Sequence, residues 1–133
     1  MKSLKSRITM GLSHGSVLQA CDNSGAKMVR IVSVKRSKTV KRRKPSAGVG
    51  DLVLVSVVKG IKELRGTVVP AIIVRQKKEY RRPDGTRIQF QDNAVVVLKD
   101  EKGNPKGTIF KGPIAKEVVG RWPGIAKVAG IVV

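Results

Sequence analysis

The sequence contains almost none of the residues on which metal sites and nucleophilic catalysis depend. Its 133 residues include one cysteine, Cys21, and one histidine, His14. A single cysteine excludes an internal disulfide framework, and no set of cysteine, histidine and carboxylate residues has the spacing of metal ligands. Neither residue has an evident partner for a nucleophile–base pair. We therefore expect no metal, no cofactor and no enzymatic activity, with His14 in a solvated loop and Cys21 as a small buried side chain.

Aromatic residues are also scarce, since Tyr80, Phe90, Phe110 and Trp122 make up only 3% of the chain. Proteins that bind single-stranded nucleic acid use rows of exposed rings as stacking platforms. Four rings, some of them in the core, cannot supply such a row. We expect Trp122 in the core, and Tyr80 either in contact with a partner or packed at the base of a hairpin.

Long apolar runs are absent as well. The longest, Leu52–Val58, has seven residues and is interrupted by Ser56, whereas a membrane-spanning helix needs about 20. The first residues, MKSLKSRITMGL, lack the apolar centre of a secretory signal. We expect no membrane partner, and the single cysteine fits the reducing cytoplasm.

Acidic residues are also few, and their scarcity leaves the chain strongly basic. Nine Asp and Glu residues oppose 28 Lys and Arg residues, so that the net charge is +19 and the isoelectric point is near 10.9. A compact protein with this excess repels itself until an anionic partner binds. Nucleic acid is the partner that such a charge most often indicates.

The positive charge is concentrated in an N-terminal arm with Lys2, Lys5 and Arg7, in the loop Lys35–Lys44, and in a hairpin arm that begins at Arg75. Seven of the ten loop residues are basic, and a merely solvated face of that density would repel itself. Because loops and arms between strands often hold binding residues, we predict that the loop and the hairpin arm bind RNA phosphates. The predicted RNA-binding residues are Lys35, Arg36, Lys38, Lys41, Arg42, Arg43, Lys44, Arg75, Lys77, Lys78, Arg81, Arg82 and Arg87.

Short β-branched and alternating apolar runs, separated by turn residues, predict a mainly β fold. The spacing favours a small antiparallel barrel or sandwich, and a barrel has no free edges to aggregate. The predicted strands are Ser16–Cys21, Ala26–Val34, Gly50–Gly60, Val68–Gln76, Gly85–Phe90 and Asn93–Leu98.

Two tight turns are predicted from residues that adopt turn geometry readily. One follows the first strand, and the other closes a hairpin in which Ile88 and Phe90 should turn back into the protein. Gly85 should have a positive φ there. The predicted turn-forming residues are Asp22, Asn23, Gly25, Pro83, Asp84 and Gly85.

In the C-terminal segment, the spacing of apolar residues changes from that of a strand to that of a helix. This spacing predicts two short helices that close one side of the barrel. In Gly112–Gly120, apolar residues pair at i and i+4, and Pro113 suits a first helical turn. Arg121–Gly130 repeats the pattern around Pro123. We expect a single domain over residues 1–133, in which 1–12 form a basic arm, 13–110 the barrel with hairpin 71–98, and 111–133 the helical part.

An ordered set of motifs resembles the family of universal ribosomal protein fourteen of the large subunit, in its archaeal and eukaryotic branch. The motifs are CDNSGAK, SAGVGDLVLVSV, AIIVRQKKEYRRPDGTRIQFQDNAVVVL, and KGTIFKGPIAKEV followed by RWPGIAKVAG. This resemblance implies a small five-stranded antiparallel β-barrel with a projecting basic hairpin and two short C-terminal helices.

The resemblance also implies a function and a set of partners. These are direct binding to large-subunit rRNA, bridges to small-subunit rRNA across the subunit interface, neighbouring large-subunit proteins three and twenty-four-e, and docking of initiation factor six on cytoplasmic ribosomes. Two other functions stay open beside it. A free-standing RNA chaperone or nucleoid-type DNA binder would favour an aromatic platform, and an RNA-modifying enzyme would need a catalytic set; the sequence shows neither.

Overall fold

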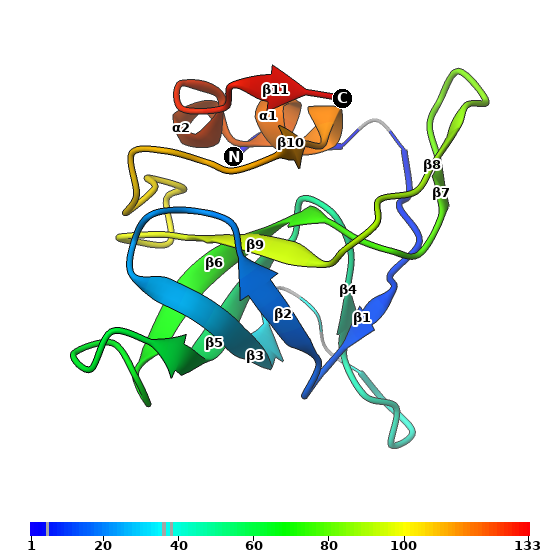
Figure 1. The fold of residues 1–133 in the computed structure, drawn as a ribbon. Coiled ribbons are helices and arrows are strands. Elements are labelled where there is room, and N and C mark those ends of the chain that lie inside the picture. The colour runs from blue at the N-terminus through cyan, green and yellow to red at the C-terminus, as the bar shows by residue number, and fades with distance from the viewer. Residues whose placement is uncertain (5, 36, 38) are drawn as a thin grey trace.

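Five strands of this chain close into a barrel. The computed structural model describes residues 1–4, 6–35, 37 and 39–133, so that Lys5, Arg36 and Lys38 of the predicted basic segments lie outside the described residues. Around the barrel the order is β2-β3-β5-β6-β9 (Figure 1). The strands are β2 (Val17–Ala20), β3 (Ala26–Val34), β5 (Leu52–Gly60), β6 (Val68–Arg75) and β9 (Ala94–Val97).

The barrel closes through one parallel pair. β2 pairs with β9 in parallel, with Gln19 opposite Ala94, whereas the other four pairs are antiparallel. The prediction of a small five-stranded barrel is confirmed, but the barrel is mixed rather than wholly antiparallel. The reason is topological, because strand directions cannot alternate all the way around a ring of five.

Residues 71–75 of β6 and all of β9 are buried on both faces, and this position determines how the rest of the chain packs. Successive side chains point to opposite faces of a strand. Ala71 and Ile73 of β6 therefore join the cluster that fills the barrel, while Ile72 and Val74 face an outer cluster. In β9, the inner residues are Val95 and Val97, and the outer residues are Ala94 and Val96.

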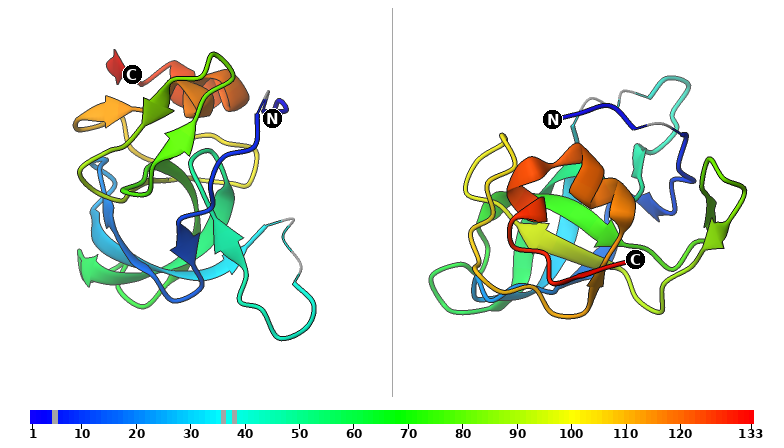
Figure 2. Two further views of the ribbon diagram at one scale, coloured as in Figure 1. Left: turned by 90° about the vertical axis from the view of Figure 1, so that its right-hand side faces the viewer. Right: turned by 90° about the horizontal axis from the view of Figure 1, so that it is seen from above.

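A C-terminal layer covers the outer face of β6 and β9. It consists of helices α1 (Lys116–Arg121) and α2 (Pro123–Ala126) and a parallel pair of strands, β10 (Pro113–Ile114) and β11 (Ile131–Val132). The left view of Figure 2 looks into the barrel and shows these elements outside its wall. Two short helices on one side of the barrel are thus confirmed.

The start of the first predicted helix was wrong. Pro113 does not begin a helix; it lies in β10, and Ala115 is still extended, with φ −63° and ψ 138°. The backbone of this segment instead bonds to the end of the chain, since Val133 N–H donates to the Ile114 carbonyl at 3.0 Å and Lys116 N–H donates to the Val133 carbonyl at 2.9 Å. Pairing with a strand that is distant in sequence therefore outweighs the local preference for a helix.

The core of the C-terminal layer is built around Trp122, which is 2% exposed. Its indole Nε1–H donates to the Gly50 carbonyl at 2.8 Å, so the ring satisfies its only donor. Ile114, Val118 and Ile125 are fully buried around it. Trp122 thus occupies the core, as the sequence predicted.

Two small strand pairs extend from the barrel. β1 (Leu12–Ser13) pairs with β4 (Ser46–Ala47), and β7 (Tyr80–Arg81) pairs with β8 (Arg87–Ile88). The second pair is the predicted hairpin, and it projects from between β6 and β9 (Figure 1). Phe90 is buried and Ile88 packs against the outer core, as expected for residues that turn back into the protein.

Both predicted turns are present with glycine at positive φ. Gly25 has φ +103° and Gly85 has φ +92°. In the first turn, the Asp22 carboxylate is buried and accepts from Val97 N–H at 3.0 Å, so the turn is fixed to the barrel. Burial raises the pKa of this carboxyl group, although hydrogen bonds from Ser24 and Val97 oppose the effect. In the hairpin turn, Asp84 accepts from Thr86 N–H at 2.9 Å.

Replacing Gly85 with valine should strain the hairpin turn while the barrel still folds. A β-branched residue at φ +92° is expected to lower the free energy of unfolding by about 1–2 kcal/mol. Gly120→Ala is the control, because Gly120 lies in α1 with open space around it and no positive φ. Denaturant unfolding of both variants, with the amide resonance of Thr86 as a local probe, tests this. Equal stability of the two variants would contradict the argument.

No helix in the part of the chain that the structure describes is long and apolar enough to cross a membrane.

Candidate nucleic-acid interface

Two basic elements extend from the same side of the barrel. The loop between β3 and β4 and the hairpin β7–β8 both project on the right of Figure 1, and Figure 2 shows them from that side in its left view. Each is an excursion between strands and carries exposed basic side chains, although Tyr80 of the hairpin is buried. The loop and the hairpin thus lie on the same side of the molecule, toward its lower and upper ends in Figure 1.

The loop carries exposed cations without acidic partners. Lys41, Arg42, Arg43 and Lys44 are all exposed, and within the described ranges none of them forms an ion pair. Lys35, at the start of the loop, is the exception, since its ammonium group lies 2.9 Å from Glu101 Oε1. The positive charge at the far end of the loop is therefore available to an external anion.

The hairpin arm adds a second group of exposed cations, made up of Lys77, Lys78, Arg81 and Arg87. Arg87 lies 3.0 Å from Glu79, but both side chains are well exposed, and such a pair contributes little to stability. Arg81 has no ion-pair partner among the described residues. These four side chains fit the predicted contact with phosphates.

Arg82 differs from its neighbour, because its side chain is only 12% exposed and contacts the C-terminal layer. Its Nε donates to Glu117 Oε1 at 2.7 Å, and its Nη2 donates to the Val133 carbonyl at 2.6 Å. Tyr80 OH donates to the other Glu117 oxygen at 2.8 Å. The two hairpin residues thus hold the hairpin against α1. We leave Arg82 out of the phosphate-binding surface, although the sequence suggested it.

Tyr80 packs at the base of the hairpin, which was one of its two expected roles. The residue is 1% exposed. Burial and the adjacent Glu117 carboxylate raise the pKa of the phenol, so the hydroxyl stays a proton donor at neutral pH. The ring therefore serves the internal contact rather than a partner.

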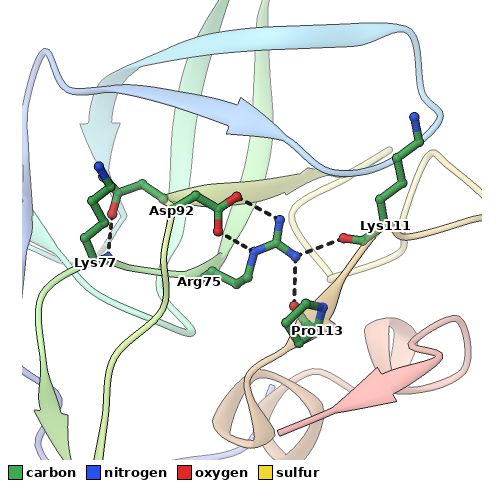
Figure 3. Close-up of polar contacts among 6 residues, drawn as sticks. Arg75, Lys77, Asp92, Lys111 and Pro113 are labelled. Carbon is green, nitrogen blue, oxygen red and sulfur yellow. Dashed lines mark hydrogen bonds and ion pairs between the residues drawn. The ribbon is translucent and has the colours of Figure 1, made fainter.

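Arg75 is also an internal residue, and Figure 3 shows its contacts. It is 7% exposed at the end of β6. Its guanidinium donates to both oxygens of Asp92, at 2.9 and 3.1 Å, and to the carbonyls of Lys111 and Pro113, each at 2.9 Å. Four of the five N–H donors of the guanidinium are thus used within the chain. We therefore assign Arg75 to the support of the hairpin base rather than to RNA.

Sequence reasoning missed the residues that position these elements. Gln76 is fully buried, accepts from Val49 N–H and donates to the carbonyls of Thr9 and Lys78. The Asn93 side chain accepts from Lys77 N–H at 2.8 Å. Like Glu117 and Asp92, these two residues form hydrogen bonds with groups that are distant in sequence or that belong to the backbone. No local pattern marks them.

The four aromatic rings are all buried. Tyr80, Phe90, Phe110 and Trp122 are at most 9% exposed, so the basic side of the molecule offers no ring on which an unstacked base could stack. The interface is suited to phosphate groups and to the shape of a folded nucleic acid.

The described residues contain no group of three potential metal ligands. His14 is exposed in a turn, and Cys21 is 4% exposed. Burial raises the pKa of the Cys21 thiol to about 11, so the thiol is protonated at neutral pH and is a poor nucleophile. Both residues have the structural roles that the sequence suggested.

Comparison with known proteins gives one consistent family. Residues 11–133 match the family model described as ribosomal protein L14p/L23e. The chain is 53% identical over 133 residues to the large ribosomal subunit protein uL14 of Nanoarchaeum equitans, covering all of both chains. It is 52% identical over 132 residues to the protein of the same name from Methanococcus vannielii, covering 99% of each. The motifs and the archaeal relatives therefore indicate the same family.

Proposed function

This chain belongs to the ribosomal protein L14p/L23e family, and on that premise we propose that it is a structural constituent of the large ribosomal subunit that binds large-subunit rRNA directly. The observation that carries the proposal is the set of exposed cations on the β3–β4 loop and the hairpin, most of which have no ion-pair partner among the described residues. Phosphate contacts by such side chains release counterions and supply most of the affinity for nucleic acid.

The preferred ligand is folded, double-helical rRNA. Proteins that recognise unstacked bases place aromatic rings against them, whereas double-stranded RNA is recognised by its shape and its phosphates. All four rings of this chain are buried, and the net charge of +19 matches a phosphate surface. Binding should therefore depend on the RNA fold more than on single bases.

The finer assignments come from the family resemblance. We propose that the basic side of the molecule lies at the subunit interface of the cytoplasmic ribosome and contributes to bridges with small-subunit rRNA. Large-subunit proteins three and twenty-four-e are the proposed neighbours, and initiation factor six is a proposed docking partner. These assignments are supported by the motifs and the relatives, and each can be tested by crosslinking.

Sedimentation tests the main assignment. A cell lysate is washed at high salt and separated on a sucrose gradient, and the fractions are probed for this chain. We expect the chain to remain with the large subunit at about one copy per particle. Release to the top of the gradient would contradict an integral ribosomal role and favour a free RNA chaperone.

Charge reversal on the hairpin tests the binding surface. The variant Lys78→Glu/Arg81→Glu should lower the affinity for large-subunit rRNA by about tenfold or more at moderate salt, because two phosphate contacts become repulsive. Lys62→Glu/Arg65→Glu is the matched control, since both residues are exposed on the β5–β6 loop, on the opposite side of the barrel in Figure 1. Filter binding over a salt series measures both. An equal loss in the two variants would argue against the assigned surface.

A further inference from the structure

The tip of the basic loop has an unusual backbone. Lys41 has φ +58° and Arg42 has φ +63°. Every other described residue with a positive φ is a glycine, at positions Gly15, Gly25, Gly50, Gly60, Gly66, Gly85, Gly103 and Gly112. A side chain makes this left-handed conformation unfavourable. Within the described residues, a positive φ at a residue other than glycine thus occurs at the tip of the basic loop and nowhere else.

The tip is a tight turn whose two central residues both have positive φ, as in a type I′ turn. Arg43 N–H donates to the Val40 carbonyl at 3.5 Å, and both central residues have positive φ. The Thr39 hydroxyl donates to the Arg43 carbonyl at 2.6 Å and thereby stabilises the turn. Asn-Gly is the pair that such turns favour, because these residues adopt positive φ with little strain. Here a Lys-Arg pair takes both central positions.

Packing within the chain does not explain this choice. Lys41 and Arg42 are exposed, and Val40 beside them is 68% exposed. Neither cation has an ion-pair partner in the ranges that the structure describes. Backbone strain of this kind clusters at functional sites. What the two residues add over Asn-Gly is two positive charges at a fixed point.

We propose that the turn Val40–Arg43 is a pre-organised phosphate-binding tip, in which the strained backbone holds Lys41 and Arg42 ready to contact two phosphates of double-helical RNA. This inference rests on the proposed function and specifies its most exposed contact. A pre-organised loop loses less conformational freedom on binding than a flexible one with the same charge. Both the charges and the tight turn therefore contribute to affinity.

The first test replaces the pair with residues suited to the turn. In the full chain, Lys41→Asn/Arg42→Gly should leave the midpoint of thermal unfolding unchanged or raised. Affinity for an RNA duplex should fall roughly tenfold at moderate salt, and the slope of log affinity against log salt should become shallower by about two. Lys62→Asn/Arg65→Gln removes the same charge from the β5–β6 loop and should change the slope less.

The second test keeps the charges and relaxes the turn. Inserting two glycines between Lys41 and Arg42 should weaken duplex binding while the net charge stays the same. Wild-type affinity in this variant would overturn the role of pre-organisation, and wild-type affinity in Lys41→Asn/Arg42→Gly would overturn the tip as a contact. If the wild-type chain itself fails to bind the duplex, the proposed function fails and this inference fails with it.

Discussion

Replacing Arg75 with alanine is expected to lower the free energy of unfolding by about 2–4 kcal/mol, because it removes a buried guanidinium from its ion pair with the partly exposed Asp92 and leaves two backbone carbonyls without their donors. Asp92 would lose two hydrogen bonds, and the carbonyls of Lys111 and Pro113 would lose one each. Figure 3 shows Asp92 on one side of the guanidinium and the carbonyls of Lys111 and Pro113 on the other. The substitution should therefore also loosen the hairpin relative to the C-terminal layer.

Two variants make the Arg75 result interpretable. Arg75→Lys keeps the charge but lacks the planar fork, so it should recover only part of the stability. Arg87→Ala breaks the exposed pair with Glu79 and should change the free energy of unfolding by less than about 1 kcal/mol. Chemical denaturation followed by circular dichroism measures all three. If Arg75→Ala were no less stable than Arg87→Ala, the structural role of Arg75 would be refuted.

Replacing Trp122 with alanine should have a comparable effect, about 3–5 kcal/mol, because it empties the centre of the outer core. The ring is 2% exposed, and it packs so closely on Gly103 that a Cβ added there would lie 2.6 Å from the ring. Its loss would also leave the Gly50 carbonyl without its donor. The cavity would lie between the barrel wall and both helices.

Controls separate volume from hydrogen bonding at this site. Trp122→Phe keeps most of the volume and removes the indole donor, so it should lower the free energy of unfolding by about 1–2 kcal/mol. Ile61→Ala, at a side chain that is 49% exposed, should have a much smaller effect. Because Trp122 is the only tryptophan, unfolding should be followed by circular dichroism. A cost in Trp122→Ala equal to that of Ile61→Ala would contradict the assigned core.

The long strands could be predicted because their patterns are local. Ala26–Val34 was predicted with the bounds that the structure has, and Gly50–Gly60 differs from β5 only by two residues at its start. The turn glycines Gly25 and Gly85 were equally predictable, because a positive φ is a requirement of single residues.

Features that depend on distant partners could not be predicted. β10 forms because residues 131–133 return to it, and nothing near Pro113 shows this. At the site, composition correctly marks the loop and the hairpin as basic, yet it cannot separate Arg81, which is exposed, from Arg82, which faces Glu117. The acid that makes the difference lies 35 residues away.

The parallel pairing of β2 with β9 has a consequence for how the chain folds as it is made. The barrel can close only after Ala94 has been synthesised and pairs with Gln19. Pairings between residues so far apart in sequence make folding slow. Until β9 is in place, the edges of β2 and β6 that it will cover are open to pairing with other chains. Ile72 and Val96 stay uncovered even longer, until the helices are synthesised. We therefore expect fragments that end before Trp122 to aggregate.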